Sequence, residues 1–383
     1  MNNKLNRIRI LFNDQELPYL MKDSNIPVGG ACVRTHIFCK GLISSGQKVG
    51  VLTWKGAKNY VNRKTDVELV ETYDLNKGFR KLRWIYYRIP CIYNKIYLYK
   101  PDLIICKSTG VLLLIFGIIS KLLKIKLVYM VTNDIFIDNR INMRLNKFDS
   151  LANRIGLYLV DSVFCQNDYQ FSIVSKKLPK KYIFKITNPY LGHGLNMRVS
   201  PSRRYIAWVG IFQKQKNMSA LLRIVKRNKK YQFCIAGSET SILDANTKNI
   251  LKKLRSCDNV KFVGYLKRKK VLEFLSKAIV LLNTSDYEGF SNTFLEAFSV
   301  GTPIVSLNVN PDNIITKNNL GCIVEEESVG EKIDFFRNHY EKDKMEKKIR
   351  TYLRDQHGYK DLSLRLIEKL KNILYKSKHG SIE

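Results

Sequence analysis

The stretch VLLNTSDYEGFSNTFLEAFSVGTPIVSL, residues 280–307, decides the fold of this chain. The apolar residues 279–282 predict a buried strand that ends in a polar loop. The apolar spacing of residues 294–298 predicts a short helix, which ends before Pro303, and residues 304–307 predict the next strand. A strand, a helix and a strand in this order build a parallel sheet, whose ligands bind at the carboxyl ends of the strands.

The loop and the helix start in this stretch have the chemistry of a sugar-nucleotide site. Backbone N–H groups at a helix N-terminus attract a phosphate or diphosphate. Glu288, in the loop, is better suited to accept hydrogen bonds from sugar hydroxyls, and Glu296, deeper in the helix, from those of a ribose. The alternative is structural, because Thr293-x-x-Glu296 is also a capping box, which stabilises a helix without a ligand.

The residues around the two glutamates favour a ligand. The segments Glu288-Gly289-Phe290-Ser291-Asn292, Leu295-Glu296-Ala297 and Gly301-Thr302-Pro303 resemble the E-x7-E signature of the retaining glycosyltransferases of the GT4 type. This resemblance implies a GT-B fold, an α/β architecture of two doubly wound Rossmann-like domains that face a central cleft. It makes Glu288 catalytic and assigns donor binding to Gly289, Phe290, Ser291, Asn292 and Glu296.

A turn earlier in the same predicted domain supplies cations. The family pattern there is Gly-Arg followed by Lys-Asn, and both cations neutralise the donor diphosphate. Gly210 and Lys216 match this pattern, so the resemblance makes Lys216 catalytic and Gly210 donor-binding, but Ile211 replaces the arginine. Lys214 would supply the missing charge as a point cation, and the alternative for either lysine is a solvated loop residue. The family places Tyr265 beside the nucleobase, where it would stack or simply pack.

The first half of the chain offers two candidate acceptor-side elements. Gly29 and Gly30 lie between a predicted strand and a predicted helix, either as a plain turn or as the family's glycine-rich loop, and they lack the G-x-G-x-x-G pattern of a dinucleotide site. Asn133 and Asp134 follow the strand predicted over residues 126–132, where the family often has a His-Asp pair. Asn133 cannot act as a base, and Asp134 is equally suited to cap a helix.

The charge of the chain predicts an anionic partner. The sequence has 66 lysines and arginines against 33 aspartates and glutamates, a net charge of +33. Residues 78–100 interleave aromatic side chains with basic ones, among them Arg80, Lys81 and Arg83. This mixture fits an anionic membrane surface, a single-stranded nucleic acid, or an amphipathic helix whose basic face is simply solvated.

Other features predict a cytoplasmic protein without a metal. The eight cysteines are scattered and have no C-x-x-C pair, which predicts buried thiols in a reducing compartment. His36 and His193 have no partner at ligand spacing, so a metal site is not expected. No signal peptide is evident, and the apolar residues 111–119 are fewer than the roughly 20 that a membrane-spanning helix needs.

These observations predict an acceptor-side domain over residues 1–200, a nucleotide-sugar-binding domain over 201–355, and a final helix, 356–383, that crosses back to the first domain. From the resemblance we expect retaining, metal-independent transfer of a sugar from a nucleotide diphosphate sugar, with no cofactor. The acceptor would be a hydroxyl of a glycan or polyprenyl-linked molecule, in surface polysaccharide synthesis at the inner face of a membrane.

Two other functions remain as alternatives. Sugar-nucleotide epimerases and phosphorylases resemble the same scaffold, whereas paired carboxylates across a glycosidic bond, as in hydrolases, are not evident. A basic nucleic-acid-binding protein is the remote alternative, and it predicts binding that weakens steeply with salt. No nucleic acid is expected as the partner.

Overall fold

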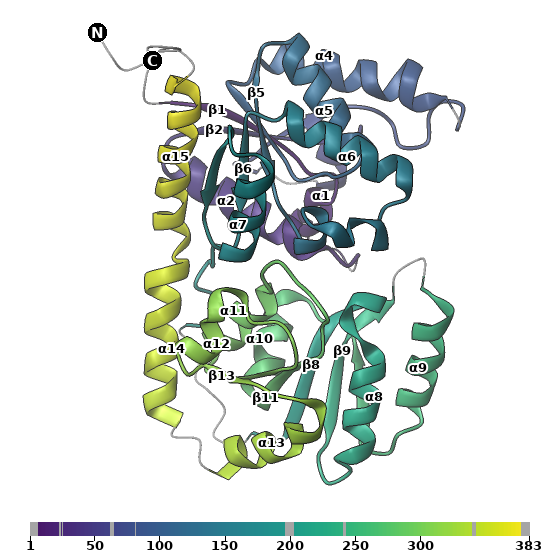
Figure 1. Cartoon of the computed structure of the whole chain (residues 1–383), viewed down its shortest axis with the longest axis vertical. Coiled ribbons are helices and arrows are strands. Elements are labelled where there is room, and N and C mark those ends of the chain that lie inside the picture. Colours follow the sequence, from purple (N-terminus) through teal and green to yellow (C-terminus); the bar gives the residue numbers. More distant parts are fainter. Residues whose placement is uncertain are drawn as a thin grey trace. The chain divides into compact units, whose positions relative to one another are not determined.

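The computed structural model describes residues 7–22, 24, 26–61, 65–80, 82–195, 203–239, 243–338 and 342–376. These residues form two compact units (Figure 1). One contains the described residues up to Pro189 together with those from Tyr359 onward, and the other runs from Tyr190 to Gly358. The domain boundary expected at residue 200, and Lys81 of the basic and aromatic segment, lie outside the described residues.

The first unit is built on a parallel sheet of seven strands in the order β3-β2-β1-β4-β5-β6-β7. Side chains alternate between the two faces of a strand, so Ile10 and Phe12 enter one core and Leu11 enters the other. The strands are β1 (Arg9–Asn13), β2 (Lys48–Thr53), β3 (Glu68–Glu71), β4 (Leu103–Cys106), β5 (Lys126–Met130), β6 (Ser162–Cys165) and β7 (Tyr182–Lys185).

Helices cover both faces of this sheet. One face packs against α1 (Leu17–Met21), α2 (Gly30–Ser44), α3 (Ala57–Val61) and α15 (Tyr359–Lys376). The other packs against the π-helical turn η1 (Trp84–Arg88), α4 (Ile89–Tyr99), α5 (Val111–Leu122), α6 (Lys147–Leu159) and α7 (Asp168–Lys177). The short turns η2 (Asp134–Phe136) and η3 (Asn139–Met143) connect β5 to α6. The final helix α15 packs on α2 through its apolar stripe.

The second unit has a parallel sheet of six strands in the order β10-β9-β8-β11-β12-β13. Here the opening stretch forms β11, α11 and β12 as predicted. The strands are β8 (Tyr205–Phe212), β9 (Phe233–Glu239), β10 (Val260–Gly264), β11 (Ala278–Asn283), β12 (Ile304–Ser306) and β13 (Gly321–Ile323). Strand β8 is longer than predicted, because the expected turn after Val209 continues the ladder to β9 as far as Phe212.

Two layers of helices enclose the second sheet. One core includes residues of α10 (Arg268–Ser276), α11 (Asn292–Ser299), α12 (Ile314–Lys317) and α14 (Lys342–His357). The opposite core includes residues of α8 (Met218–Arg227), α9 (Ala245–Arg255) and α13 (Val329–Asn338). The turns η4 (Lys214–Lys216), η5 (Pro311–Asn313) and η6 (Glu326–Ser328) complete the unit.

The structure also bears on the cysteines and on membrane-spanning helices. All eight cysteines are free, and most of them are buried, as predicted. In the described part of the chain, no helix is both long enough and apolar enough to cross a membrane.

Candidate functional site in the second unit

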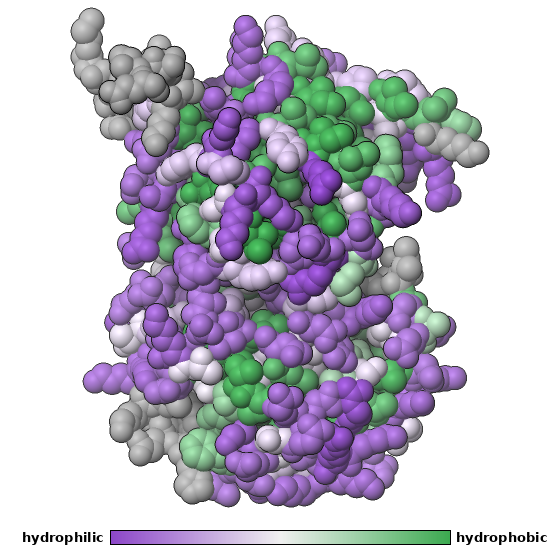
Figure 2. All heavy atoms as spheres, in the orientation of Figure 1, coloured by the Kyte–Doolittle hydropathy of each residue, from purple (hydrophilic) through white to green (hydrophobic). Residues whose placement is uncertain are grey.

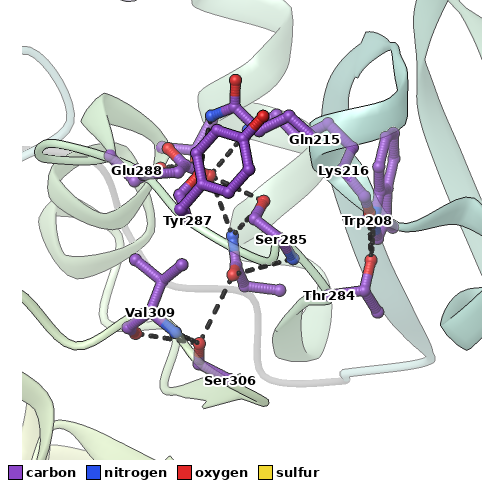
Figure 3. Close-up of polar contacts among 12 residues, drawn as sticks. Trp208, Gln215, Lys216, Thr284, Ser285, Tyr287, Glu288, Ser306 and Val309 are labelled. Atoms are coloured by element: carbon purple, nitrogen blue, oxygen red, sulfur yellow. Dashed lines mark hydrogen bonds and ion pairs between the residues drawn. The ribbon is translucent and has the colours of Figure 1, made fainter. Parts of the chain in front are cut away.

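An ion pair between Lys216 and Glu288 is the centre of the candidate site. Glu288 lies in the loop after β11, and its Oε1 atom is 2.7 Å from Lys216 Nζ (Figure 3). The same oxygen accepts hydrogen bonds from Ser285 Oγ at 2.7 Å and from Asn283 Nδ2 at 3.3 Å. The Lys216 and Glu288 side chains are only 13% and 10% exposed, so little water screens their charges.

Hydrogen bonds from two directions fix the position of Lys216. The Thr284 hydroxyl donates to the Lys216 carbonyl oxygen at 2.7 Å and accepts from Trp208 Nε1 at 3.1 Å (Figure 3). Next to it, Gln215 Nε2 donates to the Tyr287 carbonyl oxygen at 2.7 Å. The loop after β8 is thereby joined to the loop after β11, which keeps the ammonium group beside the carboxylate.

Through its side chain, Asn217 makes a third connection between the two loops. Its φ of 46° is left-handed, a conformation that asparagine tolerates better than most residues. The Asn217 side chain caps α8 by accepting from Ala220 N at 3.0 Å, and it donates to Asp286 Oδ1 at 2.7 Å. One amide therefore starts the helix and holds the glutamate loop.

The surroundings of Glu288 keep its carboxylate ionised. Burial alone would raise the pKa of Glu288, but the charge of Lys216 and the hydrogen bonds from Lys216, Ser285 and Asn283 outweigh it, so the pKa lies below its usual value. The site therefore offers an ionised carboxylate as a hydrogen-bond acceptor and an ammonium group as an anion partner.

Glu296 does not have the environment that a capping box requires. Helix α11 begins at Asn292 and its N-cap is Ser291, whose side chain makes no capping bond and instead pairs with Thr293 Oγ1 at 2.7 Å. The capping-box interpretation is therefore wrong. Burial raises the pKa of Glu296, and the nearby Arg268, whose Nε is 3.4 Å from Glu296 Oε1, partly offsets this rise.

Arg268 is a site residue that the sequence analysis missed. It is the first residue of α10, and nothing in the local sequence distinguishes it from the lysines beside it. Its proximity to Glu296 arises only when α10 and α11 pack against each other. Arg268 adds a second cation to the candidate site, next to the glutamate expected to bind ribose.

The remaining predicted donor-side residues lie in varied environments. Phe290 is buried in the core, with its ring centroid 5.3 Å from that of His357. Gly289 is the loop residue before it, and Tyr265, in the loop after β10, is 38% exposed. Lys214 is exposed and lowers the pKa of Asp244 slightly, after the larger effect of hydrogen bonds from Thr247.

Lys214 is not among the partners of Glu288, which in the described part of the chain are Lys216, Ser285 and Asn283. Compensation by Lys214 for the missing arginine at Ile211 therefore remains a prediction.

Gly210 lies under the side chain of Lys216, and its strand partner shows why the region is so compact. A Cβ atom on Gly210 would lie 3.3 Å from Lys216 Cε. Gly210 is paired with Gly237 of β9, where a Cβ atom would come within 2.0 Å of the Gly210 carbonyl oxygen. A glycine at position 237 is therefore required for β8 and β9 to approach this closely below the Lys216 turn.

In the first unit, the two predicted glycines form the start of α2. Gly29 is the N-cap, with φ −71° and ψ 158°, a conformation open to any residue. Nearby, Lys107 Nζ is 2.8 Å from Asp14 and 3.4 Å from Glu16. This cation, which follows β4, balances two carboxylates that follow β1.

Asp14, Glu16 and Cys32 also lie close enough together to be considered as metal ligands. Burial, followed by the charge of Asp14, raises the pKa of the Cys32 thiol, which favours the protonated form. A cysteine binds metals as the thiolate. With Lys107 already bound to the carboxylates, these residues fit an ion-pair cluster and not a metal site.

Asn133 and Asp134 follow β5, and it is Asn133, not Asp134, that caps the next helical turn. Asn133 caps η2 by accepting from Ile135 N at 3.2 Å, so the N-cap interpretation of Asp134 is wrong. Asp134 instead accepts from Asn167 Nδ2 at 3.2 Å and Gln170 Nε2 at 2.8 Å. Burial raises its pKa to about 6, although these amides partly oppose the rise. Its carboxyl group therefore titrates at a higher pH than an ordinary aspartate.

Comparisons with known proteins agree with this architecture. Sucrose-phosphate synthase from Thermosynechococcus elongatus superposes with a TM-score of 0.77 at 14% identity, over 97% of this chain and 100% of that one. A mutant of S. aureus TarM, in complex with UDP among other ligands, has a TM-score of 0.69 at 13% identity, over 96% and 99% of the chains. The fold is GT-B, as predicted.

The match to a known family lies in the second unit. Residues 198–356, which contain the Lys216–Glu288 pair, match the family described as Glycosyl transferases group 1. A curated relative from Klebsiella pneumoniae, "Uncharacterized 41.2 kDa protein in cps region", is 27% identical over 137 residues. The match spans 35% of this chain and 36% of the relative.

Proposed function

We propose that the protein is a retaining glycosyltransferase that moves a sugar from a nucleotide diphosphate sugar to a hydroxyl group. The observation that carries this proposal is the almost buried Lys216–Glu288 ion pair at the carboxyl ends of β8 and β11, beside the start of α11. A diphosphate needs the cation and the helix N-terminus, and a sugar needs the carboxylate. One donor molecule uses all three.

In the proposed reaction, the bond between the anomeric carbon and the diphosphate oxygen breaks, and the acceptor oxygen bonds to that carbon on the same face. The departing oxygen takes the proton of the acceptor hydroxyl. Lys216 and the N-terminus of α11 stabilise the charge that develops on the diphosphate, which is electrostatic catalysis. Glu288 orients the sugar through its hydroxyl groups. Lys216 and the helix dipole provide positive charge without a metal or a cofactor.

The nucleoside half of the donor is assigned to the other end of the site. Glu296, balanced by Arg268, accepts hydrogen bonds from the ribose hydroxyls. Exposed Tyr265 stacks on the base, and Lys214 adds positive charge to the entrance. Gly210, Gly289, Phe290, Ser291 and Asn292 shape the backbone around the diphosphate.

The acceptor side is assigned to the first unit, with Gly29, Gly30, Asn133 and Asp134 as its residues. The acceptor is a glycan or polyprenyl-linked molecule in surface polysaccharide synthesis, on the cytoplasmic side of a membrane. Support for this setting comes from the relative named for a cps region, and it is limited to a third of that protein.

A ligand screen followed by an acceptor test examines the proposal. A nucleotide that binds only the folded state raises the melting temperature, so nucleoside diphosphates and their sugars are compared by thermal shift. The matching donor is then incubated with and without an acceptor. Release of nucleoside diphosphate only with acceptor supports transfer, whereas a changed sugar without acceptor indicates an epimerase. Absence of any nucleotide-dependent shift would contradict the proposal.

A further inference from the structure

The outer face of α6 in the first unit is apolar, the reverse of an ordinary surface helix. Phe148, Leu151, Ile155 and Tyr158 are all exposed, Phe148 to 71% and Tyr158 to 62%. They are three or four residues apart, so they form one stripe along the helix. Surface helices of globular proteins normally turn such a stripe towards the core. We therefore expect this stripe to contact a partner outside the unit.

The inner face of α6 explains why the stripe faces outward. The buried residues of the helix are small or polar, namely Ala152, Asn153 and Gly156. A Cβ atom on Gly156 would lie 2.9 Å from Leu113 Cγ of α5, so the two helices pack too closely for a large side chain at that position. Asn153 Oδ1 accepts from Gly110 N at 3.0 Å, which fixes the rotation of α6. The exposed stripe is thus set by packing that the rest of the unit requires.

Further exposed apolar side chains lie on the same side of the sheet. Helix α5 exposes Ile118 and Leu122, and the η1–α4 segment exposes Ile85, Tyr97 and Leu98. All three helices belong to the layer that covers one face of the first sheet. Figure 2 shows apolar residues gathered at the surface over α4 and α5, among hydrophilic side chains. We call these exposed residues of η1, α4, α5 and α6 the apolar surface.

The charges on these helices are almost all positive. Helices α4, α5 and α6 contain the basic residues Lys95, Lys121, Lys147 and Arg154, against Asp149 as their acidic residue. Lys147 and Arg154 are exposed next to the stripe. Long basic side chains beside apolar ones favour an anionic surface with an apolar interior.

We propose that the apolar surface docks the protein on a membrane rich in anionic phospholipid. Phe148 and Tyr158 would lie at the level of the headgroups, Leu151 and Ile155 would reach the acyl boundary, and Lys147 and Arg154 would contact phosphates. A second copy of the chain fits less well, because two surfaces with the same positive charge repel each other. The elements η1 and α4, which lie within the basic and aromatic segment expected from the sequence, contribute to this surface. Helix α6, which the sequence analysis left unassigned, contributes the stripe.

Sedimentation with vesicles tests the docking directly, and it needs neither donor nor acceptor. The whole protein is mixed with vesicles of phosphatidylcholine alone or of phosphatidylcholine and phosphatidylglycerol in equal parts. We expect binding to the anionic vesicles. Replacing Leu151 and Ile155 by serine should weaken it on the order of tenfold or more, and Lys147→Gln with Arg154→Gln about fivefold per charge.

Matched controls use exposed apolar residues outside the apolar surface. Phe335→Ser in α13 and Leu364→Ser in α15 remove similar exposed side chains and should leave vesicle binding unchanged. Unaltered circular dichroism melting of each variant excludes unfolding as the cause. The proposal is overturned if the wild-type chain does not bind anionic vesicles, or if the Leu151 and Ile155 variant binds them as well as wild type. A concentration-dependent dimer that the same substitutions abolish would assign the surface to a second copy.

Because the vesicle assay contains no substrate, its outcome is independent of the proposed transfer reaction. If the protein transfers sugar to a soluble acceptor but does not bind vesicles, only the docking proposal is rejected. If it binds vesicles but no nucleotide, only the proposed function is rejected.

Discussion

Lys216 and Glu288 lie 72 residues apart in the sequence, yet their charged atoms are 2.7 Å apart because they follow neighbouring strands, β8 and β11. Both strands run in the same direction, so their carboxyl ends meet at one edge of the sheet. Both side chains are almost buried. Removal of either charge would therefore leave the other charge unpaired in a poorly solvated environment. A substitution at either residue is therefore expected to change the stability of the protein as well as the proposed activity.

Removing the cation should reduce both activity and stability. In Lys216→Met, the buried Glu288 carboxylate loses its counter-charge, which costs about 3–5 kcal/mol in the free energy of unfolding. The transfer rate should fall about a hundredfold or more, because positive charge on the leaving diphosphate is lost. Urea denaturation and initial-rate measurements test the two effects. The double variant Lys216→Met with Glu288→Gln should recover much of the stability but none of the activity.

Lys214→Met is the matched control for that experiment. Lys214 is exposed and is not a partner of Glu288, so the unfolding free energy should change little. A raised KM for the donor in Lys214→Met would show that this lysine compensates for Ile211. Equal loss of stability in the Lys214 and Lys216 variants would contradict the assignment of Lys216 to the buried pair.

Arg268 should act through Glu296 on the pH dependence of donor binding. Burial raises the pKa of Glu296 and Arg268 opposes the rise, so Arg268→Gln should raise this pKa further. Because only the ionised carboxylate accepts two ribose hydrogen bonds without a competing proton, KM for the donor should rise most at acidic pH. The acid limb of kcat/KM should therefore move to higher pH.

Two variants distinguish this positioning role from a structural one. Arg268→Lys keeps the charge and should restore the wild-type pH profile, although without the guanidinium geometry. Glu296→Gln should lose the pH dependence altogether. A uniform loss of kcat in Arg268→Gln, with an unchanged pH profile and KM, would contradict the role.

Some of this site could be predicted from the sequence, and the limit has a physical origin. Glu288 and Lys216 were found because each belongs to a local pattern with a defined spacing. Arg268 was not, because its contact with Glu296 is created by the packing of α10 on α11. The length of β8 was underestimated since Gly210-Ile211-Phe212 resembles a turn until β9 supplies its partner strand.

The same limit holds in the first unit. The alternation of strands and helices predicted its layers, whereas the partners of Asp134 come from Asn167 and Gln170, more than thirty residues later. The apolar stripe of α6 has an ordinary amphipathic spacing, so sequence periodicity would turn it inward. Only the close contact of Gly156 with α5 reveals which face is buried.

Asp134 should make the stability of the protein depend on pH between about 4 and 6. Its pKa is about 6 in the folded state against a reference value of 3.8, so the folded state holds the proton more strongly than the unfolded state. The sign follows from linkage: its contribution favours folding at acidic pH and decreases as the pH rises from about 4 to about 6. Asp134→Asn, which has no proton to lose, should lack this contribution.

Urea denaturation of both proteins at pH 4.5 and pH 7.5 gives the comparison. From pH 4.5 to pH 7.5, the free energy of unfolding of the wild type should fall by about 1 kcal/mol or more relative to that of Asp134→Asn. This is less than the full pKa difference would give, because Asp134 is only partly buried. The opposite sign would show that the carboxylate is stabilised and not strained by its surroundings.

Alanine should destabilise the protein at Gly237 but not at Gly29. In Gly237→Ala the new Cβ would lie within 2.0 Å of the Gly210 carbonyl oxygen, so β8 must shift, at a cost of about 1–3 kcal/mol. Because β8 leads into the Lys216 turn, the donor KM should rise as well.

In Gly29→Ala the nearest atom would be 3.7 Å away and the backbone is already in an ordinary region, so the unfolding free energy should stay within about 0.5 kcal/mol of the wild-type value. If Gly29→Ala still impairs transfer while donor-induced thermal shifts stay normal, the start of α2 contacts the acceptor; an unchanged rate would assign Gly29 to a plain turn.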